Sequence, residues 1–192
     1  GSDDSLNVWD LAQVPVGDPL EGVRLVLEDA GPDGVGELVV HTPYAATGRL
    51  VDGALEPMPP GPCRTRDAAR HEAYGGITLL GRMDGTIVRG GTNVYPTNVE
   101  PLVEDVPGVT GSCLVGQRSP TYGEVPVLVC ELAAGVHEEE LRRSIEARLA
   151  DELPPTDRPV EIRFVHALPR TSLGKVIRAE VKSWLEAPNG PR

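Results

Sequence analysis

Lysine is nearly absent from this 192-residue chain: its 18 basic residues include only two lysines, Lys175 and Lys182. Cysteine is scarce too. The three cysteines are odd in number and lack metal-type spacing, which favours a reduced, cytoplasmic setting over a disulfide framework. The four histidines are scattered along the chain, so the sequence predicts no metal site.

The chain also lacks an excess of positive charge and any long apolar run. Its net charge of -11 argues against general nucleic-acid binding, which needs basic side chains to neutralise phosphates. No apolar run approaches the roughly 18 residues that span a bilayer. The first residues lack the basic and apolar regions of a secretory signal. We therefore expect neither nucleic acid nor a membrane as a partner.

The first 80 residues favour strands. Apolar alternation and flanking turn residues predict three short strands, at residues 23–27, 37–41 and 76–80. Residues 42–67 show little periodicity, and the prolines within residues 58–62 argue against a regular element there. Residues 1–80 are therefore predicted to be a small β-rich subdomain, in the form of a distorted barrel.

Residues 81–192 favour a mixture of strands and helices, after a boundary in the Gly- and Asp-containing segment 81–85. Strands are expected at residues 86–89, 112–115, 125–132 and 160–165. The clearest helix covers residues 138–153, where leucine or isoleucine recurs every four residues. A shorter helix is expected from Thr97 to Val106, with Thr97 and Glu100 as a capping box.

A final helix is expected to turn four apolar residues inward: Ile177, Val181, Trp184 and Leu185. The second domain is thus predicted to be compact, with helices covering one small sheet. The fold class that follows for the whole chain is α+β.

Lys175 follows Gly174 in a loop between the last predicted strand and the last helix. Lysine carries a compact charge on a flexible stem, which suits contact with one phosphate or carboxylate oxygen. The alternative is an ordinary surface lysine at a helix start. A Walker phosphate loop is excluded, because Pro169 and Val176 stand where it needs glycine and Ser or Thr.

Four segments resemble, in order, the motifs of one enzyme family. Residues 36–40 (GELVV) are similar to a G-E-L-x-V strand, and residues 64–67 (RTRD) to a Y-R-T-G-D motif. Residues 81–100 are similar to the hinge motif G-R-x-D-D-x-I-x-x-G-G-x-N-V-x-P-x-E-V-E. Residues 168–178 (LPRTSLGKVIR) resemble the final motif P-K/R-T-x-x-G-K-x-x-R. The family is that of the adenylate-forming ligases: acyl- and aryl-CoA synthetases, peptide-synthetase adenylation domains and luciferases.

The resemblance covers nearly the whole chain and implies the C-terminal portion of an ATP-dependent acyl- or aryl-CoA (or carrier-protein) ligase. In that family a carboxylate attacks the α-phosphate of ATP to give acyl-AMP and pyrophosphate, and a thiol or amine then takes the acyl group. The small C-terminal domain is a lid that swings about a hinge between the two steps. The implied ligands are ATP or AMP with Mg²⁺, bound mainly by an N-terminal part, and CoA or phosphopantetheine as acceptor.

The resemblance also implies roles for single residues. Lys175 matches the lysine that contacts carboxylate and phosphate oxygens during adenylation, and Asp84 matches the hinge. Asp67 matches the acid that accepts hydrogen bonds from the ribose hydroxyls. Two further nucleotide contacts are Arg82 and Thr65. The loop that lets a pantetheine arm pass close to the backbone corresponds to Gly90 and Gly91.

Each of these residues also has an ordinary structural explanation. Asp84 suits a turn, and Asp67 and Arg82 suit a solvated surface. Gly90–Gly91 alone is typical of a hairpin turn, because glycine readily adopts positive φ. Glu100 is predicted to be a helix cap, not a catalyst.

Two departures from the family pattern stand beside the nucleotide motif: Arg66 replaces a glycine, and Cys63 replaces an aromatic residue. The family's phosphate loop and acyl pocket lie upstream of anything in this sequence. The chain alone is therefore predicted to be inactive and to need an N-terminal ligase domain and a small carboxylic acid. The alternatives are a catalytically silent lid-fold module that docks a carrier protein or partner enzyme, and a split ligase of two chains.

Overall fold

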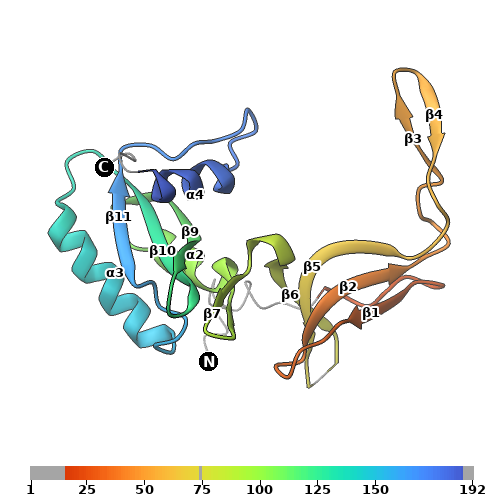
Figure 1. Cartoon of the computed structure of the whole chain (residues 1–192), viewed down its shortest axis with the longest axis horizontal. Coiled ribbons are helices and arrows are strands. Elements are labelled where there is room, and N and C mark those ends of the chain that lie inside the picture. The colour runs from red at the N-terminus through yellow and green to blue at the C-terminus, as the bar shows by residue number, and fades with distance from the viewer. Residues whose placement is uncertain (1–15, 74, 188–192) are drawn as a thin grey trace, which may run out of the picture. The chain divides into compact units, whose positions relative to one another are not determined.

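A computed structural model describes residues 16–73 and 75–187, which belong to two compact units (Figure 1). One unit lies within Gln13–Asp84 and the other within Gly85–Arg192. The division falls inside a short 3-10 helix, η1 (Met83–Gly85). We describe each unit by itself.

The first unit is built on an open antiparallel sheet of four strands in the order β1-β2-β5-β6. Its strands are β1 (Arg24–Glu28), β2 (Val35–His41), β5 (Cys63–His71) and β6 (Ile77–Arg82). A small cluster of Leu38, Ala69 and Ile77 forms part of its buried core. The predicted distorted barrel is wrong for residues 16–73 and 75–84, where no closed barrel is present: β1 and β6 are edges, and four strands are too few to close around an interior.

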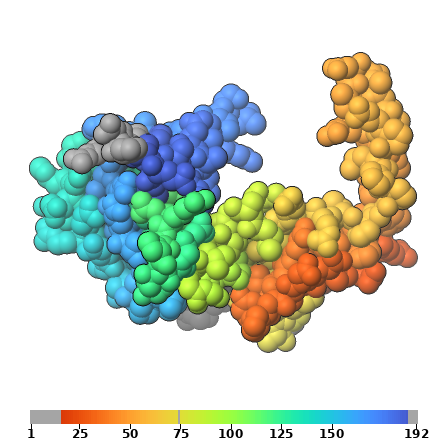
Figure 2. Space-filling model, viewed as in Figure 1, coloured from red at the N-terminus to blue at the C-terminus, as the bar shows by residue number. Residues whose placement is uncertain are grey.

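Residues 42–67, which were predicted to contain little regular structure, include a hairpin and most of β5. The hairpin pairs β3 (Gly48–Val51) with β4 (Ala54–Pro57) and stands out from the sheet (Figures 1 and 2). Its two turn residues, Asp52 and Gly53, both have positive φ, at 48° and 82°. The Asp-Gly dipeptide is a strong signal for such a turn, and the prediction overlooked it.

The second unit is built on a five-stranded mixed sheet. Its strands are β7 (Ile87–Arg89), β8 (Thr92–Val94), β9 (Val109–Ser119), β10 (Gly123–Leu132) and β11 (Glu161–Val165). β9 and β10 form a long antiparallel pair, and β11 runs parallel to the other side of β10, with Val127 opposite Glu161. The strands predicted around residues 112–115, 125–132 and 160–165 are therefore present, with longer bounds for the first.

Helices cover both faces of this sheet, and the alternation of side chains along β9 and β10 separates two cores. On one face, α2 (Pro96–Glu104) and α3 (Glu138–Glu152) pack on Leu114 and Leu128. On the other face, α4 (Arg178–Glu186) packs its Val181 and Leu185 on Val115 and its neighbours. Burial of these apolar side chains is the main stabilising term for the unit.

The capping box predicted for α2 is wrong. The helix starts after Tyr95, an extended residue at φ -101° and ψ 119° that makes no side-chain capping bond, and Pro96 occupies the first turn. α2 also ends at Glu104, two residues before the predicted Val106. Glu100 is one turn into the helix and uses its carboxylate for a long-range contact.

The described residues hold three free cysteines, and two of them, Cys113 and Cys130, are buried in the second unit. Burial raises the pKa of the Cys113 thiol to about 11 and that of Cys130 to about 12, so both stay protonated and unreactive at neutral pH. No helix of the described part is long and apolar enough to cross a membrane.

Candidate functional site

The predicted nucleotide-binding residues of the first unit lie together. Thr65 and Asp67 are on β5, and Arg82 ends the neighbouring strand β6, directly opposite Asp67. One guanidinium nitrogen of Arg82 donates to the Thr65 carbonyl at 2.8 Å and to Asp67 Oδ1 at 3.2 Å. The Thr65 hydroxyl accepts the Asp67 N–H at 3.1 Å and donates to the Leu38 carbonyl at 2.9 Å. The carboxylate of Asp67 is thereby fixed, yet remains 29% exposed.

Asp84 extends this cluster across the end of the unit. It lies in η1, and its carboxylate is 3.6 Å from Arg82 Nε. At 68% exposed, it is well solvated, so the ion pair contributes little to stability. Arg82 thus joins the predicted hinge residue to the predicted nucleotide contacts.

Arg66 adopts the left-handed conformation, with φ at 61°. Its N–H donates to Glu37 Oε1 at 3.2 Å, which holds this backbone geometry. A residue with a side chain pays about 1–2 kcal/mol for that conformation, whereas glycine adopts it freely. The structure therefore explains why the family motif has glycine here, and this chain keeps the geometry with an arginine.

Gly90 and Gly91 form the two-residue turn of the β7–β8 hairpin. Both have positive φ, at 57° and 88°. The Gly90 N–H donates to the Tyr122 carbonyl at 2.9 Å, and a Cβ at Gly90 would meet the Tyr122 ring at 3.3 Å. A Cβ at Gly91 would meet nothing within 4 Å, so the outer side of this turn is open. The hairpin-turn explanation of the two glycines is confirmed, and their predicted role towards pantetheine stays a prediction.

Lys175 lies in the loop between β11 and α4, which we call the lysine loop (residues 168–177) and which stands out from its unit (Figures 1 and 2). The loop is closed by backbone bonds from Thr171 N to the Lys175 carbonyl and from Ile177 N to the Pro169 carbonyl, each 2.8 Å. Lys175 is exposed, and within the described residues its ammonium group has no hydrogen bond or ion pair. The loop backbone is ordered by its own bonds while its charged end is free to meet a ligand.

Arg178, which directly follows the C-terminal end of the lysine loop, binds to α2 and to the sheet. Its guanidinium forms a two-pronged ion pair with Glu100 of α2, at 2.7 and 3.0 Å, and also donates to the Leu114 carbonyl. Glu100 accepts the Leu114 N–H at 2.7 Å. Burial opposes the charge of Arg178, but the bonds and charge of Glu100 outweigh it and raise the pKa of the guanidinium.

Lys182, the second lysine, is bound differently. Its ammonium donates to Glu124 Oε1 at 2.8 Å, so its charge is already paired within the unit. The charge of Lys182 is therefore paired with a carboxylate, whereas that of Lys175 has no such partner within the described residues. This difference makes Lys182 a control for Lys175.

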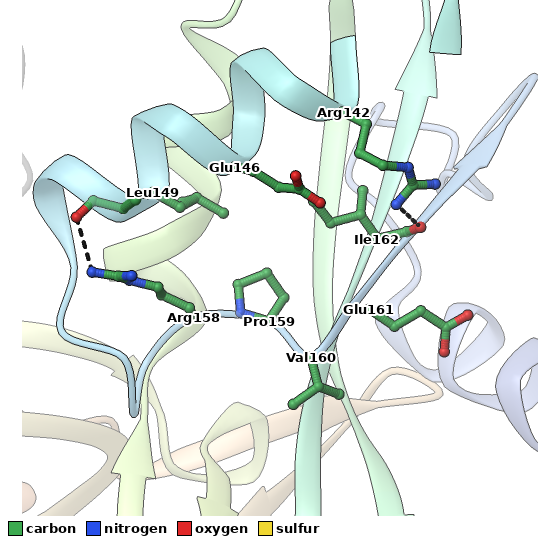
Figure 3. Close-up of a pocket in the computed structure, with 9 residues that line it drawn as sticks. Arg142, Glu146, Leu149, Arg158, Pro159, Val160, Glu161 and Ile162 are labelled. Carbon is green, nitrogen blue, oxygen red and sulfur yellow. Dashed lines mark hydrogen bonds between the residues drawn. The ribbon is translucent and has the colours of Figure 1, made fainter. Parts of the chain in front are cut away.

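A pocket of about 470 Å³ lies between α3 and the segment that leads into β11 (Figure 3). Its wall includes Arg142, whose guanidinium donates to the Ile162 carbonyl at 3.0 Å, and Arg158, which donates to the Ala150 and Leu153 carbonyls. None of the predicted site residues lines this pocket. Within the described part of the chain, no group of three His, Cys, Asp or Glu residues could hold a metal ion.

A family model, AMP-binding enzyme C-terminal domain, matches residues 98–175. The chain is 34% identical over 170 residues to YdaB of Bacillus subtilis (strain 168), a protein named as an acyl–CoA ligase. It is 32% identical over 168 residues to the 2-succinylbenzoate–CoA ligase of Lactococcus lactis subsp. lactis (strain IL1403). These matches cover 83% and 87% of this chain but only 33% and 35% of the relatives. The chain thus spans about a third of their length.

A solved structure has the same fold over most of the chain. The anthranilate CoA ligase AuaEII in complex with anthranoyl-AMP aligns with a TM-score of 0.71 at 26% identity, and the alignment covers 88% of this chain and 34% of that one. That protein holds an acyl adenylate. The likeness again concerns only a third of the larger protein.

Proposed function

This chain belongs to the adenylate-forming superfamily and matches the C-terminal third of its acyl-CoA ligases, and from that premise we propose that it supplies the lid and nucleotide contacts of an ATP-dependent acid–thiol ligase. The observation that carries the proposal is that the Lys175 ammonium is unpaired among residues 16–73 and 75–187, on a loop whose backbone is held by its own hydrogen bonds. The phosphate loop and the acyl pocket that binds the carboxylic acid belong to an N-terminal part, without which the chain is inactive.

Lys175 serves the first half-reaction. When the substrate carboxylate attacks the α-phosphate, negative charge is redistributed between the acyl oxygen, the phosphate and the departing pyrophosphate. A cation held in place before the reaction stabilises this arrangement without costly reorganisation. The lysine loop is held at both ends and so fixes where the Lys175 side chain begins, and its ammonium is bound to no other group among the described residues.

Asp67, Arg82 and Thr65 serve nucleotide binding. The fixed and partly exposed carboxylate of Asp67 is a suitable acceptor for the two ribose hydroxyls. Arg82 holds that carboxylate in place and carries further donors. Mg²⁺ would be held by the N-terminal part and by the phosphates of the nucleotide, since neither lysine loop nor β5 offers a set of carboxylates.

Gly90 and Gly91 serve the second half-reaction, after the lid swings about Asp84. The open side of Gly91 leaves room for the arm of CoA or of a carrier-bound phosphopantetheine to pass against the backbone. A thiol brought there attacks the acyl-AMP carbonyl and AMP leaves. An amine is the third class of acceptor that this arrangement admits.

One observation favours a second candidate function, a silent module that docks a carrier protein or a partner enzyme. Arg66 introduces a strained backbone and a bulky cation directly before Asp67, where the family has glycine. A module relieved of nucleotide binding would tolerate that change. Adenylation by the completed enzyme separates the two functions, because a silent module does not support it.

A chimaera tests the proposal. The C-terminal third of the Lactococcus lactis 2-succinylbenzoate–CoA ligase is replaced by the matching part of this chain, so that the relative supplies the acyl pocket. We expect 2-succinylbenzoate-dependent pyrophosphate exchange well above that of the relative's N-terminal part alone. A folded chimaera that binds ATP but gives no exchange above that background would contradict the proposal and support the silent module.

A further inference from the structure

The N-terminal end of the lysine loop is held by a carboxylate on the strand β10. Glu131, on β10, accepts the Leu168 N–H at 2.9 Å and one guanidinium nitrogen of Arg170 at 3.3 Å, both on Oε2. The other oxygen of Glu131 accepts the Thr110 hydroxyl at 3.1 Å. The bond from Leu168 is the largest cause that lowers the pKa of the Glu131 carboxyl below its ordinary range.

Arg170 carries this contact into the loop. Its second terminal nitrogen donates to the Gly174 carbonyl at 3.1 Å, next to Lys175, and its backbone pairs with Val176 across the loop. One arginine therefore connects the strand to the residue before the lysine. Arg170 is 37% exposed at its side chain, and Glu131 is 20% exposed, so the bond is partly shielded from water.

Gly111 makes room for this arginine. It lies on β9 directly opposite Glu131, and a Cβ there would be 2.5 Å from Arg170 Nη2 and 3.5 Å from a methyl group of Leu168. Any larger side chain must displace the guanidinium. The glycine thus allows the close approach of Arg170 to the sheet.

We propose that Glu131 is a positioning residue, which acts through Arg170 and the Leu168 N–H to hold the lysine loop and so to place Lys175 for adenylation. The proposal rests on the proposed function of Lys175. Together with the ion pair of Arg178 and Glu100 it gives the loop a fixed point at each end. Charge-assisted bonds of this kind are stronger than neutral ones.

Hydrogen exchange of the chain alone tests the positioning, independently of any activity. In Glu131→Gln we expect the Thr171 and Ile177 amides to exchange about tenfold faster, because a neutral group replaces a charged partner of Arg170. Amides of β9 and β10 should keep their protection. Glu161→Gln is the matched control: it breaks a similar pair, Glu161 with Arg163 at 2.7 Å, outside the loop.

If Glu131→Gln unfolds the unit, two further variants test the same contact. Arg170→Gln removes both bonds of the partly exposed arginine, and Gly111→Ala displaces its guanidinium without altering any charge. Both variants should speed hydrogen exchange at the Thr171 and Ile177 amides. Unchanged exchange at Thr171 and Ile177 in variants that remain folded overturns the proposal.

The chimaera then separates this proposal from the proposed function. Glu131→Gln should lower pyrophosphate exchange about tenfold, with little change in thioester formation from supplied acyl-AMP. Suppose that Glu131→Gln speeds hydrogen exchange of the loop amides but leaves pyrophosphate exchange unchanged, while Lys175→Ala is inactive in the same chimaera. That result overturns the positioning role alone. An unaffected Lys175→Ala variant instead contradicts the proposed function and leaves the hydrogen-exchange result standing.

Discussion

Lys175→Ala is expected to lower adenylation in the chimaera about a hundredfold, because one preorganised charged group at a centre of developing charge contributes on the order of 3 kcal/mol. Thioester formation from supplied acyl-AMP should fall far less, since the proposed role of Lys175 ends with the first step. Carboxylate-dependent pyrophosphate exchange measures adenylation, and CoA consumption with purified acyl-AMP measures the second step.

Lys182→Ala supplies the control, because it removes the only other lysine that this chain contributes, whose charge Glu124 already pairs. The rate of pyrophosphate exchange of this variant should remain close to that of the unmodified chimaera. Lys175→Arg should recover only part of the rate, since a planar guanidinium does not replace a compact ammonium. Equal losses in both half-reactions for Lys175→Ala would count against the assignment.

Arg178→Met should destabilise the second unit by about 2–4 kcal/mol, a large share of the stability of a typical domain. The substitution leaves the Glu100 carboxylate, 17% exposed, without its guanidinium, and also removes the bond to the Leu114 carbonyl. The Arg178 side chain is 38% exposed, so water reduces the loss below that of a fully buried pair. Urea unfolding followed by Trp184 fluorescence, with Trp9 replaced by phenylalanine, measures it.

A double variant separates the ion pair from the packing of Arg178. Glu100→Gln combined with Arg178→Met removes the unpaired charge, so we expect it to be more stable than Arg178→Met alone. Arg163→Met breaks the more exposed pair with Glu161 and should cost less than about 1 kcal/mol. A cost for Arg178→Met no larger than that of Arg163→Met would show that the Glu100 pair does not hold the loop.

The sequence predicts best the elements whose pattern is local. The four-residue spacing of Leu141, Ile145 and Leu149 predicts α3, and all three are buried. The apolar alternation after residue 159 predicts β11 in the same way. Such patterns depend only on which face of a helix or strand is buried, which is a property of neighbouring residues.

Errors arose where local and distant partners compete. The spacing of Thr97 and Glu100 fits a capping box, but the carboxylate of Glu100 instead pairs with Arg178, 78 residues away. No short-range pattern contains that contact. The β3–β4 hairpin was not predicted from the sequence, for another reason. The prolines within residues 58–62 outweighed the signal of Asp52–Gly53, although these prolines follow the paired residues, which end at Pro57.

The candidate site was predictable residue by residue only through the family resemblance. Composition drew attention to Lys175, and the residues around it excluded a Walker loop, but neither assigned a role. The structure adds what motifs do not contain: Thr65, Asp67, Arg82 and Asp84 form one bonded cluster. It also shows Glu131 and Gly111, which belong to no motif but lie against Arg170 of the lysine loop.

Affinity labelling shows whether Lys175 reaches the bound nucleotide. An adenosine that carries a lysine-reactive sulfonyl fluoride in place of the phosphates is reacted with the chimaera, and labelled peptides are mapped by mass spectrometry. We expect modification of Lys175 that ATP prevents, with Lys182 unmodified and with no such labelling of the isolated chain. Labelling of both lysines at equal rates, or of Lys175 regardless of ATP and of the N-terminal part, would contradict it.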